Sequence, residues 1–259
     1  MKSMPKPTIL IAIDTYAETE SESYGRSFIQ SLCNEDPRLV PERLSTEESY
    51  KDSFLGVEDF VANWWAIPVK TTVDGQARPD SFDGPSWMRK SSLIGRGMIN
   101  HGITDIKYQK HPSSIWFESR WAKDVDFNHL FEAWRELSHP DIAMLHLFTE
   151  PEMHWQDYDA DMSFRVGSFG GPAKPGLSNI GWAMAYGKGH AHEVDVARIK
   201  AAGFPVDERD GVIVVRVTES LADVVNDFDH FSRRRAELKA LFRPDLFWIK
   251  EEPSERVVA

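Results

Sequence analysis

The sequence is poor in cysteine, with Cys33 as its single thiol among 259 residues. One cysteine cannot form a disulfide within the chain, nor can it build a cysteine-based metal cluster. Cys33 lies in an apolar helical pattern, so we expect it to be buried and inert. The lack of a disulfide framework suits the cytoplasm, where we expect this protein to reside.

Long hydrophobic runs are missing as well. No apolar stretch approaches the ~20 residues that a membrane-spanning helix needs. The apolar run near the N-terminus is short, acidic residues follow it at once, and no small-residue cleavage site is clear. We therefore read Thr8–Ile13 as a first strand and not as part of a signal peptide, and we expect no membrane partner.

Basic residues are outnumbered: 30 Lys and Arg stand against 41 Asp and Glu, for a net charge of −11. Binding to phosphates needs a basic face, so nucleic acid is not expected as a direct ligand. The strongest basic cluster, Arg233–Arg235, falls on a predicted helix with carboxylates nearby, which predicts a solvated face. The negative charge favours attraction to a basic partner.

Motifs that would indicate an enzyme are also absent. The helical zinc motif HExxH and the GxSxG elbow do not occur. Two loops are rich in glycine, Gly167–Gly181 and Tyr186–Gly189, but neither has the spacing of a nucleotide-binding loop after a strand. We therefore expect a protein that is not an enzyme and needs neither metal nor cofactor. One alternative remains, a metal-dependent hydrolase that uses His190, His192 and Glu193 as ligands.

The periodicity of apolar residues predicts an α+β fold with a mixed, largely antiparallel sheet and packed helices. Residues 1–259 form either one domain or two subdomains, 1–161 and 178–250. Thr71–Pro85 is rich in Gly, Pro and Asp and reads as a long loop. Helices are predicted from Ser21, within Ser45–Ile67, and over Asp126–Leu137, Val194–Ala202 and Ser220–Phe242. Strands are predicted at Thr8–Ile13, Ser91–Asn100, Asp105–Lys110, Ser114–Trp121, Ala143–Phe148, Trp182–Tyr186 and Val212–Val217.

The most distinctive segment is Thr149–Asp161, which we call the acidic segment. It holds five carboxylates and no Lys or Arg, and it follows an apolar run that reads as a strand. Aromatic anchors among carboxylates are typical of a protein-binding surface. The predicted contact residues are Glu150, Glu152, Trp155, Asp157, Tyr158, Asp159 and Asp161. Two other acidic or loop regions, Asp14–Glu22 and Thr71–Pro85, are alternatives for the contact.

A family resemblance is carried mainly by the C-terminal run from Asn179 to Phe228, which ends in NDF, and by the RPDLF motif at Arg243–Phe247. ESYGRSFIQSL and the aromatic group around Asn63-Trp64-Trp65 agree with it in the N-terminal part. These residues resemble the immunity proteins of bacterial polymorphic toxin systems, most nearly the Imm52-like type. A related immunity family associated with type VI secretion, the DUF3396 group, is a close competitor.

The resemblance implies a cytoplasmic antidote that binds a cognate toxin, often a nuclease effector, and protects the producing cell. It supplies no catalytic residues. The acidic and aromatic residues of the acidic segment are consistent with this function, because such a surface can occupy the basic site with which a nuclease holds phosphates. A binding module unrelated to toxins remains a third hypothesis.

Overall fold

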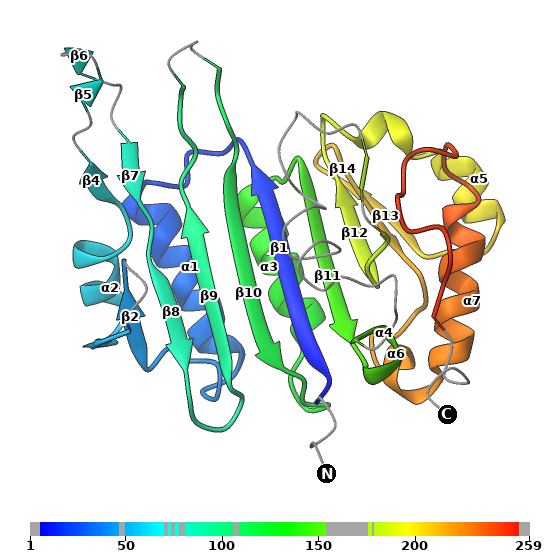
Figure 1. The fold of residues 1–259 in the computed structure, drawn as a ribbon, viewed down its shortest axis with the longest axis horizontal. Coiled ribbons are helices and arrows are strands. Elements are labelled where there is room, and N and C mark those ends of the chain that lie inside the picture. Colours follow the sequence, from blue (N-terminus) through cyan, green and yellow to red (C-terminus); the bar gives the residue numbers. More distant parts are fainter. Residues whose placement is uncertain are drawn as a thin grey trace. The chain divides into compact units, whose positions relative to one another are not determined.

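The computed structural model describes residues 6–46, 50–69, 72–73, 76–77, 81–105, 109–153, 176–177 and 179–253 (Figure 1). Its contacts divide the chain into two compact units. The N-terminal unit is Ile11–His139, and the C-terminal unit joins Met1–Leu10 to Pro140–Ala259. The sequence had suggested a boundary between residues 161 and 178, whereas the contacts divide the chain after His139.

Five strands of the N-terminal unit follow one another in the order β10, β9, β8, β2, β3. All four neighbouring pairs are antiparallel. Burial alternates strictly along β10, as expected for a strand with one face on the core. The bounds of these strands are β10 Ser113–Arg120, β9 Gly95–Asn100, β8 Ser86–Arg89, β2 Arg43–Ser45 and β3 Asp52–Ser53.

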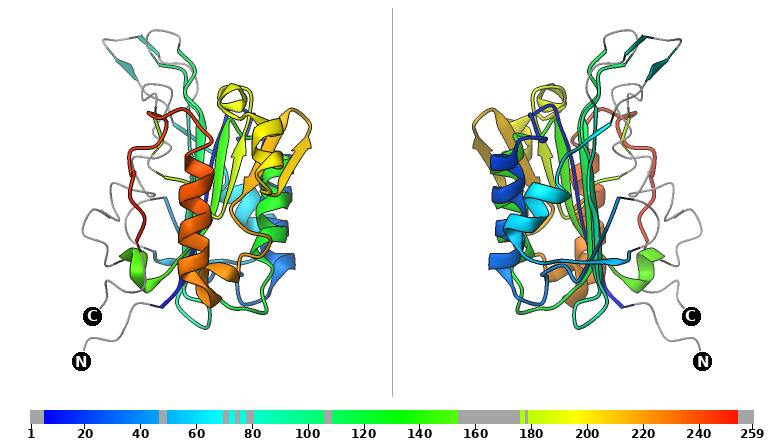
Figure 2. Two further views of the ribbon diagram at one scale, coloured as in Figure 1. Left: turned by 90° about the vertical axis from the view of Figure 1, so that its right-hand side faces the viewer. Right: turned by 90° about the vertical axis from the view of Figure 1, so that its left-hand side faces the viewer.

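Three helices lie on one face of these strands, α1 (Glu22–Glu35), α2 (Val57–Asn63) and α3 (Phe127–Ser138) (Figure 2). Their apolar sides meet in an aromatic core, where Phe28 stacks on Trp134 with ring centroids 4.2 Å apart. Trp65 packs against Phe28 at 5.4 Å and covers Gly25. A Cβ atom at Gly25 would lie 2.5 Å from the Trp65 ring, so this close approach requires glycine.

The predicted loop Thr71–Pro85 contains more structure than its composition indicated. Strands β4 (Ile67–Val69) and β7 (Ser81–Asp83) form one antiparallel pair, and β5 (Thr72–Val73) and β6 (Gln76–Ala77) form another. The loop prediction was therefore wrong in part, since β5, β6 and β7 lie within this stretch. Of the predicted strand Asp105–Lys110, the described residues show a single bridge from Thr104 to Lys110.

In the C-terminal unit, β13 (Val206–Arg209), β14 (Val212–Arg216), β12 (Ala183–Tyr186) and β11 (Ile142–Phe148) are neighbours in that order. Each pair is antiparallel. Helices α5 (Val196–Ala201) and α7 (Phe228–Lys239) lie on opposite faces of these strands (Figure 2). Every residue of β11 and β12 is buried, as cover on both faces requires. Strand β1 (Thr8–Thr15) spans the division between the units.

The prediction of one long helix over Ser220–Phe242 was wrong. The chain forms α6 (Asp223–Asn226), breaks at Asp227, and begins again as α7. Asp227 has an extended φ of −151°, and its carboxylate accepts a hydrogen bond from the backbone N–H of His230 at 3.0 Å. An aspartate at this point caps a new helix and so interrupts the apolar stripe.

The expected α+β class with a largely antiparallel sheet is confirmed. None of the helices in the described ranges is both long and apolar enough to cross a membrane. The expectation of a buried Cys33 was wrong, because the residue is half-buried on α1. Partial burial still raises the pKa of its thiol to about 11, so the reactive thiolate is disfavoured at neutral pH.

Candidate functional site

The acidic segment begins immediately after strand β11. Glu150 and Glu152 lie in the short helix α4 (Glu150–Met153). The five other predicted contact residues, Trp155, Asp157, Tyr158, Asp159 and Asp161, lie outside the described residues. The structure therefore places two of the seven predicted residues.

Glu152 does not face solvent. Its side chain is 0% exposed and lies 3.0 Å from Nε2 of His146, which is also fully buried. The backbone N–H of Trp182 donates to Nδ1 of His146, so the imidazole hydrogen is on Nε2 and is donated to Glu152. The backbone N–H of Thr149 approaches the same carboxylate at 3.4 Å. In this structure Glu152 thus anchors the start of the acidic segment instead of presenting a charge on it.

Arg235 on α7 completes the arrangement. Its Nη1 donates to Glu152 at 2.7 Å and its Nε donates to Glu252 at 2.6 Å. Lys239 forms an ion pair with the other oxygen of Glu252. We call these five side chains the buried ion cluster: His146, Glu152, Arg235, Lys239 and Glu252. The expectation that Arg233–Arg235 forms a solvated face was therefore wrong for Arg235, which is fully buried.

The electrostatics of the cluster keep Glu152 ionised. Burial alone would raise the pKa of its carboxyl, but the interactions with His146 and Arg235 outweigh burial and lower the pKa to about 2. The carboxylate has strong donors on both oxygens and no exposure to solvent. Such an arrangement holds α4, β11, α7 and the chain near Glu252 together, and it offers no open position for acid–base chemistry.

The His190/His192/Glu193 group does not converge on one point. His190 Nδ1 lies 3.2 Å from Asp141 Oδ2, and Glu193 accepts from Arg243 Nε at 2.7 Å. His192 is 71% exposed, 3.5 Å from Glu193. No group of three or more His, Cys, Asp or Glu side chains suited to a metal occurs in the ranges that the structure describes. The geometry gives the metal-dependent hydrolase no support.

The acidic region Asp14–Glu22 has one carboxylate in the core and others on the surface. Asp14 is 7% exposed and sits at the end of the buried strand β1. Glu18 and Glu22 are exposed and lie next to the start of α1. Ser21, from which a helix was predicted, caps α1 by accepting a hydrogen bond from the backbone N–H of Tyr24. Acidic side chains here also suit the positive end of the helix dipole.

These carboxylates belong to a larger surface of the N-terminal unit. The three helices and their leading loops, residues 16–38, 57–63 and 121–139, contain eleven Asp and Glu and four Lys and Arg. We call this the acidic helical layer. The exposed acids come from all three helical regions: Glu18, Glu22, Glu58, Asp124, Asp126 and Glu136. Sequence periodicity identified the apolar sides of these helices. The acidic residues between the apolar positions could have predicted this surface, but the sequence-based prediction did not use them.

Ion pairs tie the acidic helical layer together. Arg26 of α1 pairs with Glu58 of α2, and His129 of α3 lies 2.6 Å from Glu35 of α1. The pairing raises the pKa of His129. Arg38 bridges Asp36 at 2.7 Å and Asp124 at 2.9 Å. Because the acids outnumber the cations, the layer stays negative after these pairs form, and it can attract a basic surface over about a Debye length of 8 Å.

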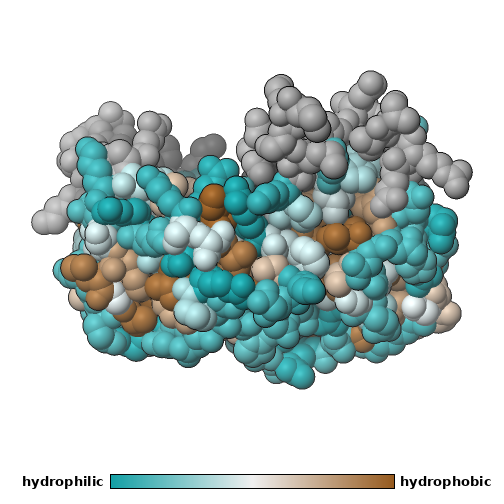
Figure 3. All heavy atoms as spheres, turned by 90° about the horizontal axis from the view of Figure 1, so that it is seen from below, coloured by the Kyte–Doolittle hydropathy of each residue, from teal (hydrophilic) through white to brown (hydrophobic). Residues whose placement is uncertain are grey.

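Apolar side chains accompany the charges. Leu55, just before α2, is 75% exposed, and Tyr16, just before α1, is 37% exposed. On the face drawn in Figure 3, hydrophobic residues likewise form separate groups among hydrophilic ones. Exposed apolar residues with charged neighbours can act as anchors in a protein interface. The acidic helical layer thus has exposed apolar side chains beside its negative charge.

Comparison with known proteins gives a relation in structure and none in sequence. No family model matches the chain, and no curated protein matches it. Among solved structures, the fold is similar to Pseudomonas aeruginosa T6SS protein PA0821, with a TM-score of 0.54 and 10% sequence identity. The match covers 95% of this chain and 77% of the other. At this level of identity the similarity concerns the fold alone.

Proposed function

We propose that this protein is an immunity protein that binds and neutralises a cognate antibacterial toxin in the producing cell. The observation that carries the proposal is the fold, which is similar to that of a T6SS protein. The resemblance of the C-terminal motifs to Imm52-like immunity proteins points the same way. The acidic helical layer supplies a surface of the expected charge.

The proposed mechanism is occupation of a basic site. A nuclease toxin needs Lys and Arg side chains to hold phosphates, and a carboxylate surface competes for them. The carboxylates would raise the association rate and favour basic partners, while buried apolar anchors would slow dissociation. An interface of standard size, roughly 1,600 Å² in total, is the minimum expected for an antidote that must stay bound.

Two surfaces compete for the contact. The acidic helical layer has described exposed acids, whereas the acidic segment has the denser run of carboxylates. In the segment, the variant E150K/D157K/D159K should weaken toxin binding and reduce its salt dependence. Glu152 is omitted because reversing a buried, paired charge would disturb the fold itself. Unchanged affinity in this triple variant would remove the segment from the interface.

The function itself is tested in cells. The product of the neighbouring gene, the candidate toxin, is expressed alone and together with the chain, and growth is followed. The proposal predicts rescue of growth and a complex that co-purifies at a fixed ratio. Absence of both would reject it. A regulatory binding module unrelated to toxins would leave the cells unprotected and would capture some other partner.

A further inference from the structure

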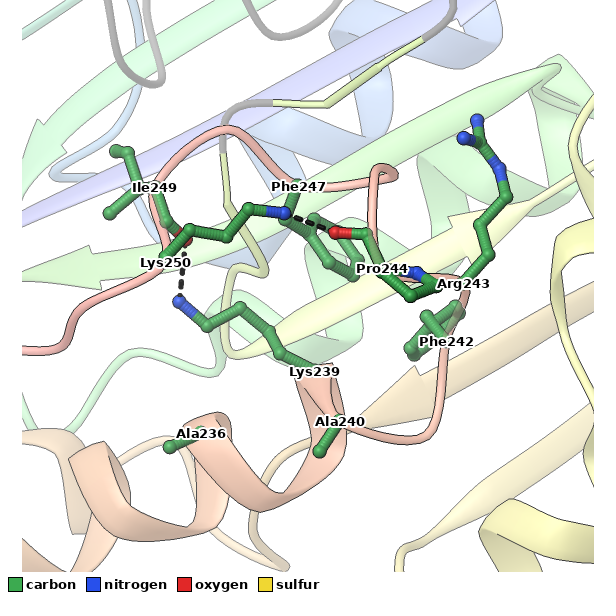
Figure 4. Close-up of a pocket in the computed structure, with 9 residues that line it drawn as sticks. All are labelled: Ala236, Lys239, Ala240, Phe242, Arg243, Pro244, Phe247, Ile249 and Lys250. Carbon is green, nitrogen blue, oxygen red and sulfur yellow. Dashed lines mark hydrogen bonds between the residues drawn. The ribbon is translucent and has the colours of Figure 1, made fainter.

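A cavity of about 310 Å³ opens in the C-terminal unit between the end of α7 and the chain that follows it (Figure 4). Its volume is at the lower limit of typical small-molecule sites. Nine described residues line it, and all nine come from residues 236–250. The cavity is separate from the acidic helical layer, since it is formed within the C-terminal unit.

The apolar part of the cavity is centred on two buried aromatic rings. Phe242 and Phe247 are 6% and 3% exposed, and their rings meet edge to face at 5.3 Å. Ile249 lies beside them as a further apolar lining residue. On the helix side, Ala236 and Ala240 lie one turn apart, and their small side chains leave room for a ligand (Figure 4). Aromatic rings pack favourably against other aromatic rings.

The polar part of the cavity is cationic. Lys239, Arg243 and Lys250 line it, and no Asp or Glu is among its described lining residues. The ammonium of Lys239 donates to the carbonyl of Ile249 at 2.9 Å, and that of Lys250 donates to the carbonyl of Pro244. Arg243 is oriented by Glu193, which accepts from its Nε at 2.7 Å. Glu252 and Glu193 balance the charges of Lys239 and Arg243, whereas Lys250 is exposed at the opening of the cavity.

We propose that this cavity binds a small, planar aromatic carboxylate. The ring would lie against Phe242 and Phe247, and the carboxylate would face the ammonium of Lys250. A chain with a net charge of −11 repels anions in general, so an anion that binds here must be selected by local contacts, chiefly with the ammonium of Lys250. This inference is independent of the proposed toxin binding.

The test uses 2-naphthoate as the probe, with the intact chain in isothermal titration calorimetry. Saturable one-to-one binding is expected. The neutral analogue 2-naphthamide should bind at least roughly fivefold more weakly, since it lacks the charge that the cations select. Equal affinity for the two compounds, or no saturable binding of the acid, would overturn the proposal.

Two variants locate the site. A240F fills the space beside α7, and K250E reverses the charge at the opening; each should weaken 2-naphthoate binding roughly tenfold, about the effect of one lost contact. Ala201 and Lys200 on α5 are exposed and are not among the lining residues, so A201F and K200E are matched controls and should bind like the wild type. Wild-type affinity in both A240F and K250E would place the probe elsewhere and reject the site.

Discussion

Arg235 Nη1 lies 2.7 Å from Glu152 Oε1 inside the C-terminal unit, although 83 residues separate them in the chain. Both side chains are at most 1% exposed. The pair joins α7 to the first turn of the acidic segment, and Arg235 extends the connection to Glu252. The position of the segment's first residues therefore depends on a contact that no local pattern reveals.

Removing the guanidinium should destabilise the fold strongly. The variant R235M leaves the carboxylates of Glu152 and Glu252 buried without their main partner, which typically costs about 3–5 kcal/mol. Urea denaturation followed by circular dichroism measures the free energy of unfolding. R233M is the matched control, because Arg233 is exposed on the same helix and should cost less than about 0.5 kcal/mol. Equal stability of the two variants would contradict this role.

Stability should depend on the ionisation of Glu152. Its pKa in the folded state is lowered from 4.5 to about 2. A lowered pKa means that the carboxylate stabilises the fold above about pH 4.5, and that this contribution is lost as the pH falls toward 2. The difference in unfolding free energy between the wild type and E152Q should therefore shrink between about pH 5.5 and pH 3, by about 2 kcal/mol. A constant difference across that range would show that Glu152 is not the titrating group.

His101 should give the fold a second, milder pH dependence. It is 5% exposed, with Nδ1 2.9 Å from Thr19 Oγ1 and Nε2 2.7 Å from the carbonyl of Trp65. Burial lowers its pKa below 6.5, although the Trp65 carbonyl opposes the change. The neutral ring is thus favoured in the folded state, and stability falls as the pH drops below about 6.5. H101N should remove this slope in chemical denaturation series, whereas H192N, at a largely exposed histidine, should retain it.

Charge reversal in the acidic helical layer should slow toxin association. E18K/E58K/E136K changes three exposed acids that cap no helix, and should lower the association rate constant roughly tenfold at low salt. Stopped-flow or surface-based kinetics against the cognate toxin measure the effect. E208K/E219K/E251K makes the same charge change at exposed positions of the C-terminal unit, and should alter the rate much less. If both variants lower the association rate constant equally, the net charge of the protein controls association and the acidic helical layer is not a specific contact.

Much of the fold followed from local pattern. The apolar run at β1, the alternation along β10 and the stripes of α1 and α3 were each predicted within a few residues. These elements have a periodicity that matches one buried face. The break at Asp227 was missed because the apolar stripe continues across it, and only the capping geometry interrupts the helix.

For the candidate surfaces too, some features follow from the sequence and others only from the tertiary structure. The sequence by itself determined an acidic, nearly cysteine-free α+β protein, its dense run of carboxylates at Thr149–Asp161, and its lack of catalytic motifs. Only the tertiary structure decided that Glu152 and Arg235 neutralise each other in the interior, while the acids of three separate helices share one surface. The physical reason is that the residue type alone gives the charge of a side chain, whereas its burial and its ion-pair partners depend on segments that are distant in the chain.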